Sequence, residues 1–218
     1  MKNKMKLIEE IKFSPTLSLW KSKFDLTNKD NMITTCETLL KDKPGGGGPG
    51  HATYYLNNEL KYNGHVEIVI KNELDRIMYS GINACIELHN KVFNEIKTNC
   101  WVNIVHSKNP EQNIYDSNDN ITFHNHVELN AISKLPLPLY TFVCYIQVPN
   151  NLSGDDGVLF IKDVDESIFS ILPNEGEILI MKGDLPHVPN YAPNSTKDRI
   201  VLAGSIRMDF IKLNKTLL

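Results

Sequence analysis

Hydrophobic residues in the first half of the chain recur at helical spacing. In residues 28–42 the apolar side chains follow at intervals of three and four: Met32, Ile33, Cys36, Leu39 and Leu40. Residues 72–97 carry a stronger stripe of the same kind, made by Ile77, Ala84, Cys85, Leu88, Val92 and Ile96. The opposite face of this second segment is polar or charged. These patterns predict two helices, the second amphipathic with one face buried against a core.

After Cys100 the pattern changes to short apolar and β-branched runs separated by turn-forming residues. Six runs predict strands: 101–107, 120–128, 140–148, 157–163, 177–183 and 199–210. A further strand is possible at 65–70. Six or more short strands in about 110 residues are typical of a β-sandwich or barrel.

The helical pattern of the first half and the strand pattern of the second half together predict an α+β chain with a mainly β core. We expect residues 1–98 to form a helical, supporting region that packs on a core of residues 99–212, followed by a tail at 213–218. Between the two predicted helices, residues 43–51 read KPGGGGPGH. A phosphate-binding loop would require a Gly-Lys-Ser/Thr ending, so a surface loop or lid is the better interpretation.

Charge and composition narrow the class of protein. The 218 residues include 23 Lys and Arg against 26 Asp and Glu, a net charge of −3. This balance gives no general electrostatic support for a nucleic-acid or membrane partner. No apolar run approaches a membrane span, and Glu9 and Glu10 interrupt any signal-peptide core. The four cysteines show no CxxC spacing, which is typical of reduced thiols in a cytoplasmic protein.

Candidate chemistry gathers around three histidines and one glutamate. His124, His126 and Glu128 alternate along one predicted strand and therefore share a face. His187 follows 59 residues after Glu128, directly after another predicted strand. Two imidazoles and one carboxylate form the ligand set of non-haem Fe(II) oxygenases. His124 is a rival ligand, about 6–7 Å along the strand from His126, and is otherwise a rim residue or a hydrogen-bond partner of the site.

The order of these segments resembles that of the Fe(II)/2-oxoglutarate-dependent dioxygenases, above all the prolyl-hydroxylase-like branch and its small relatives in marine bacteria and phages. The resemblance covers residues 101–210. It rests on WVN at 101–103, HVE at 126–128, YTFVCYIQVP, DGVLFI, GEILIMKGDLPHVP and the arginine of KDRIVLAGSI. It implies a double-stranded β-helix (a jelly-roll, cupin-like core) with N-terminal supporting helices.

Carried onto this sequence, the resemblance makes His126, Glu128 and His187 the iron ligands. Glu128 stands where the commoner pattern has aspartate, and its extra methylene requires the carboxylate to fold back. Arg199, 12 residues after His187, would bind the distal carboxylate of 2-oxoglutarate. A guanidinium suits that role because its N–H groups match a carboxylate in pairs.

Two further residues are implied less specifically. Tyr145 would donate its hydroxyl to the same cosubstrate carboxylate, or it is simply a core aromatic. Asn103 would lie near the keto-acid end of the cosubstrate, or it satisfies a backbone group.

The implied activity is that of a dioxygenase that uses Fe(II), 2-oxoglutarate and O₂ and releases succinate and CO₂. Its substrate would be a peptidyl residue such as proline, or a small metabolite. A carboxylate ligand at Glu128 argues against a halogenase. Two other classes remain open: a non-catalytic module that binds a metal or ligand, and a cupin-like metalloenzyme that does not use 2-oxoglutarate.

Overall fold

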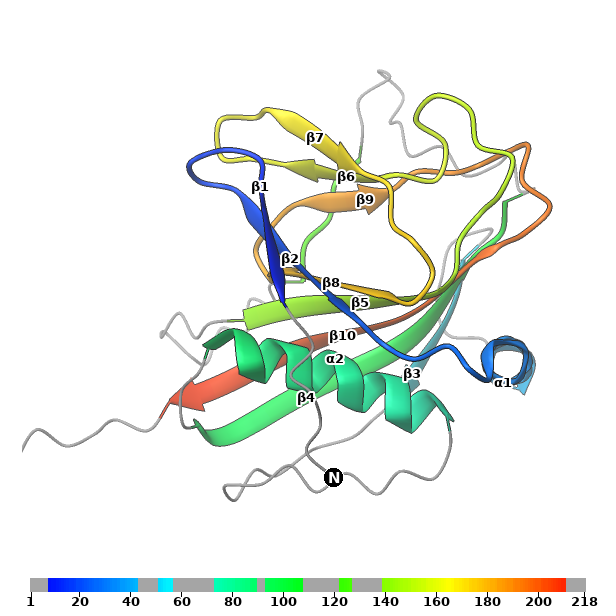
Figure 1. Cartoon of the computed structure of the whole chain (residues 1–218), viewed down its shortest axis with the longest axis horizontal. Coiled ribbons are helices and arrows are strands. Elements are labelled where there is room, and N and C mark those ends of the chain that lie inside the picture. Colours follow the sequence, from blue (N-terminus) through cyan, green and yellow to red (C-terminus); the bar gives the residue numbers. More distant parts are fainter. Residues whose placement is uncertain are drawn as a thin grey trace, which may run out of the picture.

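The protein is built from two stacked antiparallel sheets (Figure 1). The computed structural model describes residues 8–42, 51–56, 73–89, 93–107, 122–126 and 139–210. In these residues the larger sheet has seven strands, in the order β1 (Glu9–Lys12), β2 (Ser18–Lys23), β8 (Glu177–Lys182), β5 (Leu139–Gln147), β10 (Arg199–Phe210), β4 (Phe93–Val105) and β3 (His51–Leu56). The smaller sheet has the order β7 (Ile168–Ile171), β6 (Leu159–Lys162) and β9 (His187–Pro189).

Two helices lie on the side of the larger sheet that faces away from the smaller one (Figure 1). Helix α2 (Glu73–His89) runs along β5, β8 and β10, and α1 (Lys29–Asp42) lies beside β3 and β5. Within the described residues, neither helix is long and apolar enough to cross a membrane.

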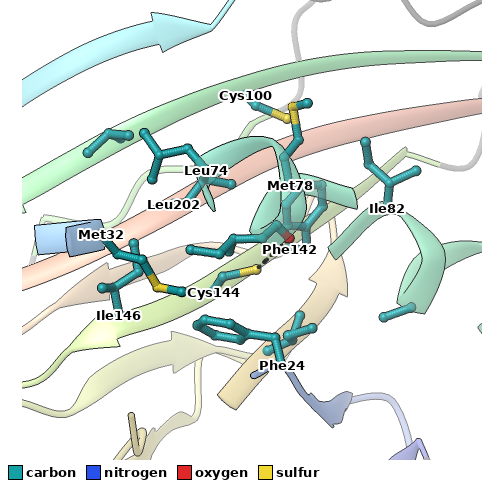
Figure 2. Packing of buried hydrophobic residues seen from close by; sticks show 14 of the residues in the cluster. Phe24, Met32, Leu74, Met78, Ile82, Cys100, Phe142, Cys144, Ile146 and Leu202 are labelled. Atoms are coloured by element: carbon teal, nitrogen blue, oxygen red, sulfur yellow. Dashed lines mark hydrogen bonds between the residues drawn. The ribbon is translucent and has the colours of Figure 1, made fainter. Parts of the chain in front are cut away.

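The larger sheet separates two hydrophobic cores because alternate residues of a strand point to opposite faces. The helix-side core joins α1 and α2 to the sheet and includes all four cysteines: Cys36, Cys85, Cys100 and Cys144. Figure 2 shows Met78, Phe142 and Cys144 among its buried side chains. The inter-sheet core contains Tyr145 and Val201 from the larger sheet and Ile161 from the smaller one. The candidate chemistry lies on the inter-sheet side.

Phe142 of β5 occupies a slot that only glycines leave open. Its ring packs against Gly81 of α2 and Gly204 of β10. A Cβ at Gly204 would lie 2.5 Å from Cζ of Phe142, and a Cβ at Gly81 would overlap the same ring. These glycines therefore allow the helix and strand to approach the aromatic ring closely.

We expect Gly204→Ala to lower the free energy of unfolding by about 1–3 kcal/mol, the usual cost of overpacking a core. Urea unfolding followed by circular dichroism measures the loss. Phe142→Leu removes Cζ and Cε1, the two ring atoms that the new methyl group meets, and leaves only its contact with Sγ of Cys100. In a double-mutant cycle, Gly204→Ala should therefore cost less in the Phe142→Leu background than in the native protein. Equal costs in the two backgrounds would contradict the slot.

The predicted elements and the observed ones differ in definite places. The helix predicted for 28–42 is confirmed as α1. Five of the six predicted strands are confirmed: β4, β5, β6 and β8 with shifted ends, and β10 with the predicted ends. The helix predicted for 72–97 is too long, because it ends at His89 and Phe93 begins β4. Ile96 pairs with Met208 in the β4–β10 ladder, so strand pairing outweighs the helical spacing there.

The predicted strand 120–128 is also corrected. Its described part, residues 122–126, makes one isolated bridge between His124 and His187 rather than a regular strand. The possible strand at 65–70, the glycine loop at 43–50 and the tail at 213–218 lie outside the described residues. The predicted regional boundary at residue 98 falls within β4, and strands from both sides of it join one sheet.

Candidate active site

Three histidines converge beside the smaller sheet. His187 opens β9, and the backbone of His124 pairs with it through two hydrogen bonds: His187 N–H donates to O of His124 (2.8 Å) and His124 N–H donates to O of His187 (3.1 Å). The N–H of His126 donates to O of Gly183 (3.0 Å). These backbone contacts hold residues 122–126 against the loop and strand that carry His187. One potential ligand atom from each histidine lies within 4.8 Å of the other two.

The spacing of two of these side chains suits a shared metal ion. Nε2 of His126 lies 3.2 Å from Nε2 of His187. Imidazole nitrogens bind transition metals at roughly 2.0–2.1 Å, so two on one ion lie about 2.9–3.4 Å apart for bond angles between 90° and the tetrahedral value. Imidazole suits iron, zinc, copper and nickel. The two Nε2 atoms therefore fit a divalent transition metal, both in their spacing and in their chemical type.

His187 is held in the form that a metal requires. Its Nδ1 lies 2.8 Å from the carbonyl oxygen of Leu185. A carbonyl only accepts, so Nδ1 carries the proton and Nε2 keeps a free lone pair that faces His126. Pro186 favours an extended Leu185 and so helps to place this carbonyl.

Burial keeps two of the imidazoles neutral. His187 is only 4% exposed, and its burial lowers its pKa to about 3, with the neighbouring His124 adding to the effect. Burial and the charge of His124 lower the pKa of His126 to about 4. His124 itself is exposed. Neutral imidazoles bind metal without first losing a proton.

A second polar group lies on the inter-sheet face of the larger sheet. Arg199 is the first residue of β10 and is 3% exposed. Its Nη2 donates to the carbonyl oxygens of Gly157 (2.6 Å) and Asn190 (2.9 Å). Its Nε and Nη1 have no hydrogen-bond partner, and it makes no ion pair, within the described residues. A buried guanidinium with two unpaired donors is costly unless an anion completes it.

The structure places Tyr145 and Asn103 beside this arginine. Asn103 of β4 and Tyr145 of β5 both pair with Val201 of β10, two residues after Arg199. Cross-strand partners share a face, so these side chains line one strip of the inter-sheet face. Tyr145 is 2% exposed. Burial raises its pKa to about 12 against the opposing effect of Arg199, so its hydroxyl keeps its proton as a donor. The buried Oδ1 of Asn103 has no partner within the described part of the chain.

Trp101 connects the strip to the histidines. It lies two residues before Asn103 on the same face of β4, and its ring centroid is 5.1 Å from that of His126. The inter-sheet side therefore carries a cluster of three histidines and a buried guanidinium, with an aromatic side chain between them.

The predicted site residues are placed as follows. His126 and His187 come together, and Arg199, Tyr145 and Asn103 share the neighbouring strip. Glu128 lies outside the described residues.

The sequence interpretation missed several groups around Arg199. The carbonyl oxygens of Gly157 and Asn190 accept hydrogen bonds from the guanidinium of Arg199. Tyr191 also lies near this guanidinium: burial raises the pKa of the Tyr191 hydroxyl, and the charge of Arg199 opposes that rise. No spacing in the sequence marks these loop residues, because loop folding alone brings them to β10.

Comparisons with known proteins agree with this arrangement at the level of fold. The sequence matches no family model and no curated protein. A prolyl-4-hydroxylase from Pseudomonas putida superposes with a TM-score of 0.55 at 12% identity, over 87% of this chain and 92% of that one. SnoK, a non-heme alpha-ketoglutarate-dependent carbocyclase from nogalamycin biosynthesis, gives 0.54 at 11% identity over 88% and 80%. HygX from Streptomyces hygroscopicus, with nickel and 2-oxoglutarate bound, gives 0.50 at 12% identity over 87% and 82%.

These matches define the class of fold. The chain has the fold of the 2-oxoglutarate/Fe(II) oxygenases, as its resemblance in sequence implied.

Proposed function

We propose that this protein is an Fe(II)- and 2-oxoglutarate-dependent dioxygenase with a double-stranded β-helix core. The observation that carries the proposal is the buried guanidinium of Arg199, whose Nε and Nη1 lack partners within the described residues. It lies on the inter-sheet face that also leads to the histidine cluster. A cosubstrate with a metal-chelating end and a distal carboxylate suits both groups at once.

His126, Glu128 and His187 would hold the iron, with Glu128 assigned from the sequence alone. When bound, the iron with 2-oxoglutarate and O₂ supplies the oxidising chemistry that converts the oxo acid to succinate and CO₂ and hydroxylates the substrate. The chain positions the cosubstrate. Arg199 and the protonated hydroxyl of Tyr145 would bind its distal carboxylate, and Asn103 would lie near its keto-acid end.

The substrate we propose is a peptidyl residue, with proline as the first choice, or a small metabolite. The likeness to the prolyl-4-hydroxylase supports the first, and the likeness to the carbocyclase SnoK supports the second. The four cysteines are buried and form no disulfide, which fits the cytoplasmic location that we propose.

A second candidate follows from the third imidazole. Cupin-like metalloenzymes that do not use 2-oxoglutarate tend to hold their metal with three or four histidines, and His124 adds a third here. In that case the unpaired donors of Arg199 would serve a different anion.

An anaerobic absorption titration tests the proposal. Metal-stripped protein is mixed with Fe(II) and then with 2-oxoglutarate. We expect a weak visible charge-transfer band, because the 2-oxo group and its carboxylate chelate the iron. Succinate is the matched control: it lacks the keto oxygen and should give no band. Iron binding without a band on addition of 2-oxoglutarate would contradict the proposal and favour the cupin-like alternative.

A further inference from the structure

We propose that His124 is a metal ligand, so that three imidazoles, from His124, His126 and His187, hold the ion. The inference rests on the proposed function only for the presence of a divalent metal and does not require 2-oxoglutarate. It departs from the ligand set that the sequence resemblance implies, in which His124 has no place.

Backbone pairing directs the side chain of His124 toward the site. His124 and His187 exchange both N–H···O bonds, which makes them a directly opposed, hydrogen-bonded antiparallel pair. Side chains of such a pair project from the same face, with Cβ atoms about 4.5–5.5 Å apart. The same backbone pairing therefore places both His124 and His187, so the nearness of their side chains does not depend on the choice of rotamer alone.

The three rings lie close together. Ring centroids lie 4.5 Å apart for His124 and His187, 5.3 Å for His124 and His126, and 5.0 Å for His126 and His187. One potential ligand atom from each of the three side chains lies within 4.8 Å of the other two. Small side-chain movements, of the kind that metal binding commonly produces, would bring all three onto one ion.

The usual alternative role, as hydrogen-bond partner of a ligand, is already filled on His187. A metal-bound histidine normally donates its other ring N–H to a carbonyl or carboxylate, and Nδ1 of His187 donates to Leu185. His124 therefore does not serve His187 in that way.

Paramagnetic proton NMR of the Co(II)-loaded protein, without 2-oxoglutarate, tests the inference. Imidazoles bound to Co(II) give strongly shifted ring-proton signals, and a matched sample made with ring-deuterated histidine identifies them. We expect the signals of three imidazoles in the native protein and of two in His124→Ala. His106→Ala removes an exposed histidine that contacts Asp198, and this control should keep all three.

The outcomes separate the ligand from a neighbour. Two imidazoles in the native protein, or an unchanged count in His124→Ala, would overturn the inference. The native count decides even where the variant folds poorly. We also expect the Co(II) dissociation constant to rise at least about 10-fold in His124→Ala. This rise supports the inference but does not decide it, because loss of a residue that only supports a ligand also weakens metal binding by about 10–100-fold. Failure of 2-oxoglutarate to perturb the spectrum would count against the proposed function alone.

Discussion

Arg199→Met is expected to raise the dissociation constant for 2-oxoglutarate by on the order of 100- to 1000-fold, the usual cost of removing one partner from a buried charge pair. Methionine fills much of the same volume but has no donors. The native Nη2 is already occupied by Gly157 and Asn190, so the donors lost to the cosubstrate are Nε and Nη1. Anaerobic titration of the Fe(II)-loaded protein with 2-oxoglutarate measures the change.

Arg199→Lys is the matched variant for this experiment. It keeps the positive charge but loses the paired geometry of the guanidinium, so its dissociation constant should fall between those of the native protein and Arg199→Met. Metal affinity should remain within about threefold of the native value in both variants, since in the described residues Arg199 donates to Gly157 and Asn190 and not to His126 or His187. A change of less than about fivefold in Arg199→Met would show that this arginine does not bind the cosubstrate.

His187→Ala is expected to weaken Fe(II) or Co(II) binding by more than about 100-fold, exceeding the 10- to 100-fold effect typical of residues that only support a ligand. His187 is the most buried of the three histidines, and the hydrogen bond from its Nδ1 to Leu185 fixes the direction of the lone pair on Nε2. Competition with a coloured chelator measures the dissociation constant. Conversion of 2-oxoglutarate to succinate should fall to background at micromolar metal.

His106→Ala serves again as the control, because it also removes one imidazole from the chain. Its metal affinity should equal that of the native protein. Because His187 is buried, its replacement by alanine leaves a gap, so thermal unfolding of the metal-free variants is measured as well. Native-like metal affinity in folded His187→Ala would place the metal elsewhere and would contradict the proposed ligand set.

The central strands could be predicted because burial on both faces leaves continuous apolar runs. β5 reads LYTFVCYIQ and β8 reads EILIMK, and both lie inside the larger sheet between other strands. The outer strands β1 and β7 have four residues each, and none of these residues is fully buried. Such short edge strands depend on a neighbour for pairing and leave little pattern of their own.

The overlong helix shows where local spacing misleads. Ile96 continues the apolar stripe of α2 at helical spacing, yet it belongs to β4. Its partner in the ladder, Met208, is 112 residues away in sequence (208 − 96). A pairing over that distance has no local signal.

The candidate site was predictable as a set of residue types, not as an arrangement. Alternation and order pointed to His126, His187 and Arg199. The direct opposition of His124 and His187 depends on two segments meeting across 63 residues, and the unpaired donors of Arg199 depend on how the loops at Gly157 and Asn190 fold over it.

The division of the interior into two cores has a chemical consequence. A protein that handles O₂ at a redox-active metal exposes its own thiols to oxidation, and thiolates also compete for metal ions. All four cysteines of this chain lie in the helix-side core, across the full thickness of the larger sheet from the histidines. Burial raises the pKa of Cys36 and Cys100 to about 12 and raises that of Cys85 further. Under the proposed function, the sheet would therefore separate the sulfur atoms from the metal and shield them from oxidation.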